Sequence, residues 1–168
     1  MSKVITFSTA FPKYHPKAGQ PTYFVERLHK SLDGYREIER LEVTPDLMPF
    51  FNFAEYGNCD PKHHTIRSGN RWKVGDKFSP RIWSEIPYQS KQIIIAPDIE
   101  IKKIYDFYID PLSGDYVLDG FPVKIDKLKI IATNDGFTEL DDFELWFKLK
   151  KGEYFYGQII CWNDEIDY

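Results

Sequence analysis

The spacing of apolar residues predicts a strand, a loop and a helix in the first part of the chain. Residues 3–9 are rich in β-branched and aromatic side chains, as short strands are. Residues 11–21 hold three prolines and one glycine and predict a loop. A helix is predicted from Thr22, which can cap it, to about Leu32, with Gly34 ending it. Its apolar face has helical spacing and comprises Phe24, Val25, Leu28 and Leu32.

The stretch that follows has no clear period. Its apolar positions fit a helix or a strand equally well up to about residue 43. Pro45, Pro49 and the run Phe50-Phe51-Asn52-Phe53 then predict an irregular, aromatic-rich insertion over residues 45–59. Loops of this length are uncommon in compact domains and are often functional.

From residue 62 onward the pattern predicts mainly strands. The expected strands cover residues 64–67, 77–83, 91–96, 99–109, 116–118, 123–132 and 154–162. Turns are expected at Val74-Gly75-Asp76 and around Gly114 and Gly120, and a loop at residues 134–136. Thr138 and Asp141 have the spacing of a capping box and predict a helix to about Phe147.

Together these elements predict one α+β domain over residues 1–168. Two main helices would flank six or seven closely spaced strands. Such strands, joined mostly by short turns, favour a small mixed or antiparallel β-barrel. Strands and helices do not alternate regularly enough for a doubly wound parallel sheet.

The composition of the chain excludes several classes of protein. Hydrophobic residues make up 42% of the chain and aromatic residues 17%, which excludes disorder from low hydrophobicity. The formal net charge of −4 means that nucleic acid would have to be bound by a local basic patch. Cys59 and Cys161 are too few for a disulfide scaffold or a zinc ribbon. The apolar run at residues 93–96 is far too short to span a bilayer, so a cytoplasmic protein without membrane contact is expected.

Reactive side chains are densest in the segment Pro61-Lys62-His63-His64-Thr65-Ile66-Arg67. On a strand, His63, Thr65 and Arg67 would share one face, and the intervening residues would share the other. Adjacent histidines point to opposite faces, so a shared metal ion is not expected, and the alternative is two partly exposed histidines. HExxH, CxxC, GxGxxG, GxxxxGK and GxSxG motifs are absent from the sequence, and no metal or cofactor is predicted.

A further candidate ligand contact is His15, which lies among Lys13, Lys17 and Gly19. The alternative is a solvated loop histidine with no role in binding.

The run KHHTIR, followed by RWKVGDKF, resembles the ASCH domain family of the PUA-like superfamily. Lys62, Thr65 and Arg67 match its K-x-x-T-x-R signature, and Gly75-Asp76 matches the turn that opens the next strand. The resemblance covers roughly residues 22–163. It implies a small β-barrel with a cleft beside the signature, and binding of RNA or modified nucleotides. A minimal member of the family has no segments that correspond to residues 1–21 and to the insertion 45–59.

One branch of that family resembles an amidohydrolase that removes the acetyl group from acetylated cytidine. The resemblance implies a catalytic set of Lys62, Thr65 and a downstream carboxylate, for which Asp135 is the candidate. The family has a glutamate there. Aspartate is one methylene shorter, and small misplacements of a catalytic group are costly.

Three hypotheses remain open. The first is a binding module for RNA, a nucleotide or a modified base in a cleft lined by Lys62, Thr65 and Arg67. Its further candidate contacts are His63, His64, Arg71, Trp72, Trp83, Tyr88 and His15, where the aromatic rings would stack a base or, alternatively, fill the core. The second is amidohydrolase activity, with Thr65 as nucleophile or as the residue that positions a water. The third is a protein-interaction module that uses residues 45–59, whose phenylalanines would otherwise form a small second core.

Overall fold

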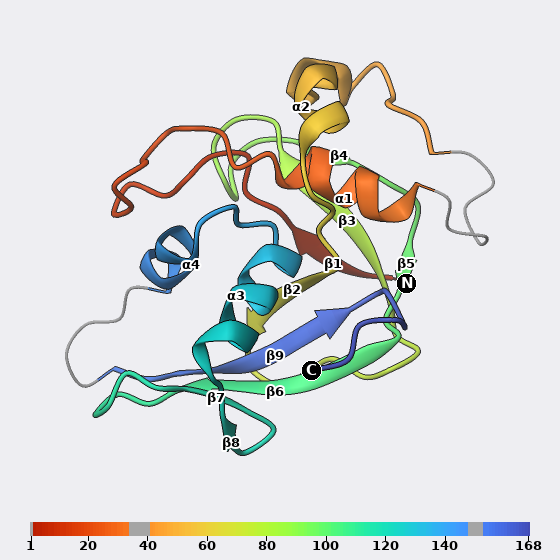
Figure 1. Cartoon of the computed structure of the whole chain (residues 1–168). Helices are drawn as coiled ribbons and strands as arrows, with labels where there is room; N and C mark the ends of the chain where they lie inside the picture. Colours follow the sequence, from red (N-terminus) through yellow and green to blue (C-terminus); the bar gives the residue numbers. More distant parts are fainter. Residues whose placement is uncertain (1, 34–40, 148–152) are drawn as a thin grey trace. The chain divides into compact units, whose positions relative to one another are not determined.

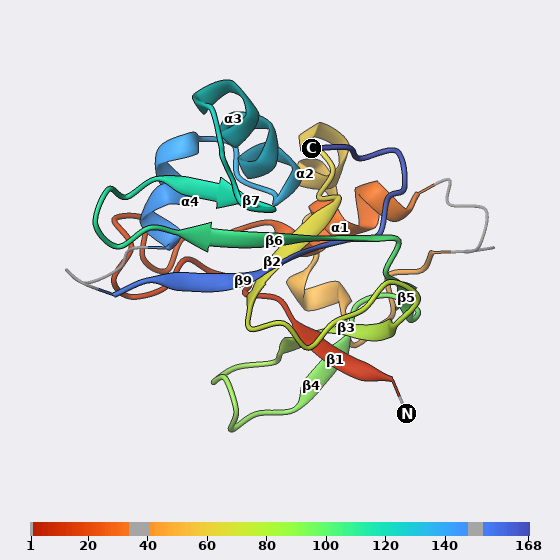
Figure 2. The same ribbon diagram turned by 90° about the horizontal axis from the view of Figure 1, so that it is seen from below.

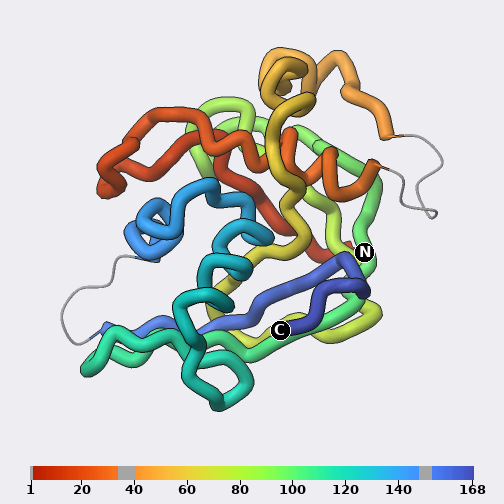
Figure 3. Tube along the Cα trace, viewed as in Figure 1, coloured from red at the N-terminus to blue at the C-terminus, as the bar shows by residue number. Residues whose placement is uncertain are grey.

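The computed structural model describes residues 2–33, 41–147 and 153–168 of the chain (Figure 1). It divides into two compact units, each made of two separate stretches of sequence. Unit 1 comprises Met1–Lys62 and Lys77–Glu100, and unit 2 comprises His63–Asp76 and Ile101–Tyr168. Figure 3 traces the long second stretch of unit 2 from green to blue. No helix in the described ranges is long and apolar enough to cross a membrane.

Unit 1 contains a mixed sheet centred on β3 (Lys77–Trp83). β1 (Lys3–Thr6) pairs with it in parallel, whereas β4 (Gln92–Ile94) and β5 (Ile99–Glu100) pair with it antiparallel. The strand predicted over residues 77–83 is confirmed with the same bounds. The strand predicted over residues 3–9 ends at Thr6, and the one over 91–96 shortens to β4.

Helix α1 (Phe24–Leu32) begins two residues later than predicted. Its N-cap is Tyr23, which has a left-handed backbone with φ of 57° and forms no side-chain cap hydrogen bond. The hydroxyl of Thr22 instead accepts a hydrogen bond from Phe24 N–H (3.4 Å) and donates one to Ser8 O (2.6 Å). Gly34, expected to end the helix, lies outside the described residues.

The insertion 45–59 is more regular than predicted. It holds a 3₁₀ turn, η1 (Met48–Phe50), and helix α2 (Phe53–Asn58), which packs against α1. Helix α2 was not predicted, because proline and phenylalanine dominate the run before it. Asn52 caps α2 by accepting a hydrogen bond from Glu55 N–H at 3.1 Å. Phe51 is buried, whereas Phe53 is 59% exposed, so the insertion supplies both core and surface.

Unit 2 contains an antiparallel sheet in the order β2-β9-β6-β7-β8. Its strands are β2 (His64–Ser68), β6 (Lys103–Ile109), β7 (Tyr116–Leu118), β8 (Phe121–Pro122) and β9 (Phe155–Cys161). Figure 2 shows helices α3 (Ile125–Asn134) and α4 (Leu140–Trp146) on one face of this sheet. A cluster of aromatic rings around Phe107 and Phe143, both fully buried, fills its core.

Two expectations for this region are wrong. Residues 123–132 were expected to form a strand, but they form most of α3. Leu128, Ile131 and Ala132 are its buried residues, at i, i+3 and i+4, and this helical spacing outweighs the β-branched content. The predicted capping box of α4 is also wrong, because the N-cap is Glu139 and makes no side-chain cap hydrogen bond.

The predicted α+β class is confirmed, with helices and strands in both units. Four α-helices and nine strands lie within the described ranges, where two helices and six or seven strands were expected. The strands pair as one mixed and one antiparallel sheet.

Candidate functional site

The KHHTIR segment divides between the two units. Lys62 closes the first stretch of unit 1, and the rest of the segment begins unit 2. Within unit 2, Thr65 pairs with Ile160 and Arg67 pairs with Gln158 of β9.

Lys62 has one of the largest fully buried side chains of the protein, with 1% of its surface exposed. Its backbone N–H donates to Arg27 O at 2.9 Å. Its ammonium nitrogen lies 4.6 Å from the ring centroid of Phe24 and 5.9 Å from that of Phe7. Aromatic faces stabilise a cation in this position, more strongly when water is excluded. Unit 1 thus holds the lysine of the signature in a fixed aromatic environment.

His64 is fully buried in unit 2, where a chain of polar groups fixes its ring. The Tyr168 hydroxyl accepts a hydrogen bond from Asn134 Nδ2 at 2.9 Å and lies 2.7 Å from His64 Nδ1. The other ring nitrogen, Nε2, lies 4.0 Å from Asp135 Oδ1.

Electrostatics keep the Tyr168 hydroxyl protonated. Burial raises the pKa of Tyr168, and the nearby Cys161 and Asp135 raise it further, although the hydrogen bond from Asn134 lowers it. Tyr168 therefore remains a neutral donor at physiological pH. The sequence analysis missed Tyr168, because nothing in the local pattern near residue 168 indicates a long-range contact with His64.

His63 has different neighbours from His64. Its Nδ1 lies 3.2 Å from Asn163 Nδ2, and its backbone N–H donates to Asn134 O at 2.8 Å. Burial lowers the pKa of His63, an effect that Glu165 partly offsets. The expectation of two partly exposed histidines holds for His63 and is wrong for His64. Within the described residues, no group of three or more His, Cys, Asp or Glu side chains is placed to hold a metal ion.

The other signature residues of unit 2 differ in exposure. Thr65 is 4% exposed and Arg67 is half-buried. Asp135, 4% exposed, follows the last turn of α3, where its backbone N–H donates to Ile131 O at 2.9 Å. The structure thus brings Asp135 beside His64.

Among the aromatic candidates, Trp72 belongs to the core. It is 2% exposed, and the side-chain amide of Gln158 binds both its backbone N–H (3.1 Å) and its carbonyl (3.2 Å). Arg71 is exposed and lies over the Trp72 ring. In unit 1, Trp83 and the 87%-exposed Tyr88 have ring centroids 5.4 Å apart and present an accessible aromatic pair.

The alternative for His15, a solvated loop histidine, is wrong. It is 3% exposed, its Nδ1 accepts a hydrogen bond from Lys17 N–H at 3.1 Å, and its ring lies 4.5 Å from that of Phe11. These contacts stabilise the loop of residues 11–21 from inside.

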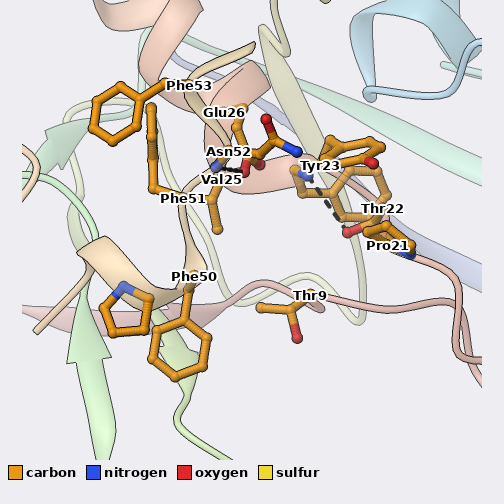
Figure 4. A pocket seen from close by; sticks show the side chains of 12 residues that line it. Thr9, Pro21, Thr22, Tyr23, Val25, Glu26, Phe50, Phe51, Asn52 and Phe53 are labelled. Carbon is orange, nitrogen blue, oxygen red and sulfur yellow. Dashed lines mark hydrogen bonds between the residues drawn. The ribbon is translucent and has the colours of Figure 1, made fainter. Parts of the chain in front are cut away.

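Unit 1 also contains a pocket that the sequence analysis missed. It has a volume of about 540 Å³ and lies between the first turn of α1 and residues 49–53 (Figure 4). The carboxyl group of Glu26, 3% exposed, accepts a hydrogen bond from Asn52 N–H at 2.7 Å. In sequence, Glu26 looks like an ordinary polar position of an amphipathic helix, and its hydrogen bond with Asn52 had not been expected.

No family model, curated protein or solved structure matches this chain.

Proposed function

We propose that the protein binds a nucleotide or a modified nucleobase, free or within RNA, through the segment of residues 62–67, on a PUA-like β-barrel fold. The observation that carries the proposal is the burial of this segment's polar side chains. Lys62, His64 and Thr65 are each at most 4% exposed. Burying polar groups is unfavourable unless they are hydrogen-bonded or otherwise compensated. Ionisable groups at functional sites are often buried, which supports a site at this segment.

The segment's chemistry suits a base better than a long duplex. Lys62 and Arg67 supply cationic donors, and Thr65 supplies a hydroxyl. A single base requires few charges, which is compatible with the net charge of −4. The half-buried Trp83 and the exposed Tyr88 offer rings for stacking, which contributes roughly 1–3 kcal/mol per base.

The test is a thermal-shift panel of nucleosides, acetylated cytidine and short single-stranded RNAs. The variants are Lys62→Met, which keeps the length of the side chain, Arg67→Ala, and Lys129→Ala as a control at an exposed position of α3. At least one ligand should stabilise the wild type and the control, with affinity at least about tenfold weaker in Lys62→Met and Arg67→Ala. Equal binding by all four proteins would overturn the proposal, as would no binding to any ligand.

The second candidate is hydrolysis of the acetyl amide of acetylated cytidine, giving cytidine and acetate. The observation that favours it is the buried carboxylate of Asp135 beside His64 in the same unit as Thr65. The resemblance assigns Lys62 and Thr65 to the reaction and makes Asp135 the candidate carboxylate. Acetate release by the wild type, lost in Thr65→Val and in Asp135→Asn, would establish the activity. Ligand binding without acetate release would leave a binding module.

A further inference from the structure

The pocket of unit 1 is chemically distinct from the KHHTIR segment. Its twelve lining residues are Thr9, Pro21, Thr22, Tyr23, Phe24, Val25, Glu26, Pro49, Phe50, Phe51, Asn52 and Phe53. None of them belongs to residues 62–67. Figure 4 shows the rings of Phe51 and Phe53 on one side, Pro21 and Tyr23 on the other, and Glu26 with Asn52 between them. A volume of about 540 Å³ lies within the range of small-molecule sites.

Glu26 is the charged side chain among the residues that line this pocket. It lies in the first turn of α1 and is almost fully buried. Asn52 N–H donates to its Oε1 at 2.7 Å and holds the carboxyl group in place. A carboxylate has about four acceptor positions. Glu26 therefore retains acceptor capacity for a ligand that presents N–H groups.

Aromatic side chains form a preorganised wall beside Glu26. The ring of Phe51 is held by His29 (5.0 Å), Phe53 (4.9 Å) and Tyr56 (5.6 Å), measured between centroids. Phe53 is 59% exposed and remains available for contact. A planar ring entering the pocket would pack against fixed aromatic surface, with little loss of side-chain entropy.

Charge restricts the ligand further. None of the twelve lining residues is Lys, Arg or His. A phosphate group would find no cationic partner among them, whereas N–H donors would meet the carboxylate of Glu26. The complementary ligand is thus a planar heterocycle that presents two adjacent N–H donors and needs no charged group.

We propose that this pocket binds the base of a guanine-type nucleoside, whose N1–H and 2-amino group donate to Glu26 while its ring packs against Phe51 and Phe53. The site is separate from the one under "Proposed function" and does not depend on it. Carboxylates that accept two N–H donors form strong, orienting pairs. Adenine and cytosine, which present one donor and one acceptor, would fit a protonated carboxyl group instead.

The protonation of Glu26 makes this specificity depend on pH. Burial raises its pKa and Glu55 raises it further, whereas the hydrogen bonds from Asn52 and from its own backbone, together with the charge of Arg27, lower it. Guanosine requires the ionised form. Its affinity should therefore increase as the pH rises through the pKa of Glu26, and any affinity for adenosine should decrease.

The experiment is calorimetric titration of the full-length protein with guanosine, inosine, 1-methylguanosine and adenosine at pH 5 and pH 8. Guanosine should bind the wild type, and more tightly at pH 8. Inosine lacks the 2-amino donor and 1-methylguanosine lacks N1–H, so each should bind about tenfold more weakly.

Matched variants locate the site. Glu26→Gln keeps the shape of the side chain but replaces one acceptor by a donor, and it should weaken guanosine binding at least about tenfold. Glu55→Gln removes a neighbouring carboxylate that does not line the pocket and should bind at pH 8 like the wild type. Phe53→Ala removes an exposed ring and should weaken binding with little change in stability.

The proposal is overturned if guanosine does not bind, if Glu26→Gln binds it normally, or if 1-methylguanosine binds equally well. Far-UV circular dichroism and the unfolding midpoint of each variant establish that it is folded. Glu26→Gln should respond like the wild type to any ligand bound through residues 62–67, so failure of this inference and failure of the proposed function are separately observable.

Discussion

Gly157 of β9 allows a close approach between β2 and β9, next to the KHHTIR segment. A Cβ atom at this position would lie 2.2 Å from Arg67 O and 2.9 Å from Arg67 C. The first distance is 1.2 Å short of the 3.4 Å at which ordinary contact begins. Both atoms belong to the backbone and cannot rotate away. In Gly157→Ala the two strands must therefore separate around the pair of Ser68 and Gly157.

The expected destabilisation follows from two contributions. Overpacking of one methyl group against a rigid neighbour costs roughly 1–3 kcal/mol. Each weakened hydrogen bond between the strands contributes about 0.5–1.5 kcal/mol. The free energy of unfolding should fall by about 3 kcal/mol. With a urea m-value of about 2 kcal/mol/M, the unfolding midpoint should fall by about 1.5 M.

The assay is urea unfolding followed by tryptophan fluorescence, to which Trp72, Trp146 and Trp162 of unit 2 contribute. The matched control is Gly57→Ala in α2, where no atom lies within 4 Å of the added Cβ. Alanine should stabilise that helix by up to about 1 kcal/mol. A Gly157→Ala protein with the midpoint of the wild type would refute the argument from close strand contact.

Three further predictions concern a core phenylalanine, a buried histidine and the two thiols. The ring of Phe143 is fully buried among other rings. In urea unfolding, Phe143→Ala should reduce the free energy of unfolding by about 3–5 kcal/mol, and Phe143→Leu by less than half of that. Similar losses in the two variants would count against a role for the shape of the ring. Burial lowers the pKa of His29 below the 6.5 of the unfolded chain, so below about pH 6.5 the unfolded state gains a proton that folded His29 resists. Stability should fall as the pH drops from 7.5 to 5.5, and less so in His29→Gln; an equal fall in both proteins would contradict this cause. Burial raises the pKa of Cys161 to about 12 and also raises that of Cys59. A thiol-reactive dye should therefore label the native protein slowly and modify two thiols per chain in denaturant. Rapid labelling of both thiols in the native state would contradict their burial.

Local sequence pattern predicted those elements in which one face is apolar and turn residues mark the ends. β3 was predicted with its observed bounds, since the Gly75-Asp76 turn precedes it and Phe78, Ile82 and Trp83 favour a strand. α3 was taken for a strand because Ile125, Ile130 and Ile131 raise the β-branched content. Only the spacing of its buried residues distinguishes the helix, and that spacing becomes clear once the sheet beneath it is known.

The candidate site was only partly predictable for a related reason. The residue types of the KHHTIR segment indicated reactive chemistry, but not that His64 would be fully buried or that Tyr168 would fix its ring. Both facts depend on a contact across 104 residues. Glu26 gave no signal, because a carboxylate in an amphipathic helix is ordinarily solvated and the segment that covers it follows 26 residues later.

The interleaving of the two units constrains how the chain can acquire its structure during synthesis. β1 must wait for its partner β3, which ends at Trp83, and β2 must wait for β9, which starts at Phe155. Pairing between distant segments is slow, since loop closure precedes the contacts that offset its entropy. On the ribosome, β2 therefore emerges long before its partner strand, and a nascent chain stalled before residue 155 should be sensitive to protease within unit 2. A cut at any single point in the sequence cannot separate the two units, so the protein cannot be divided into two independent fragments at one junction.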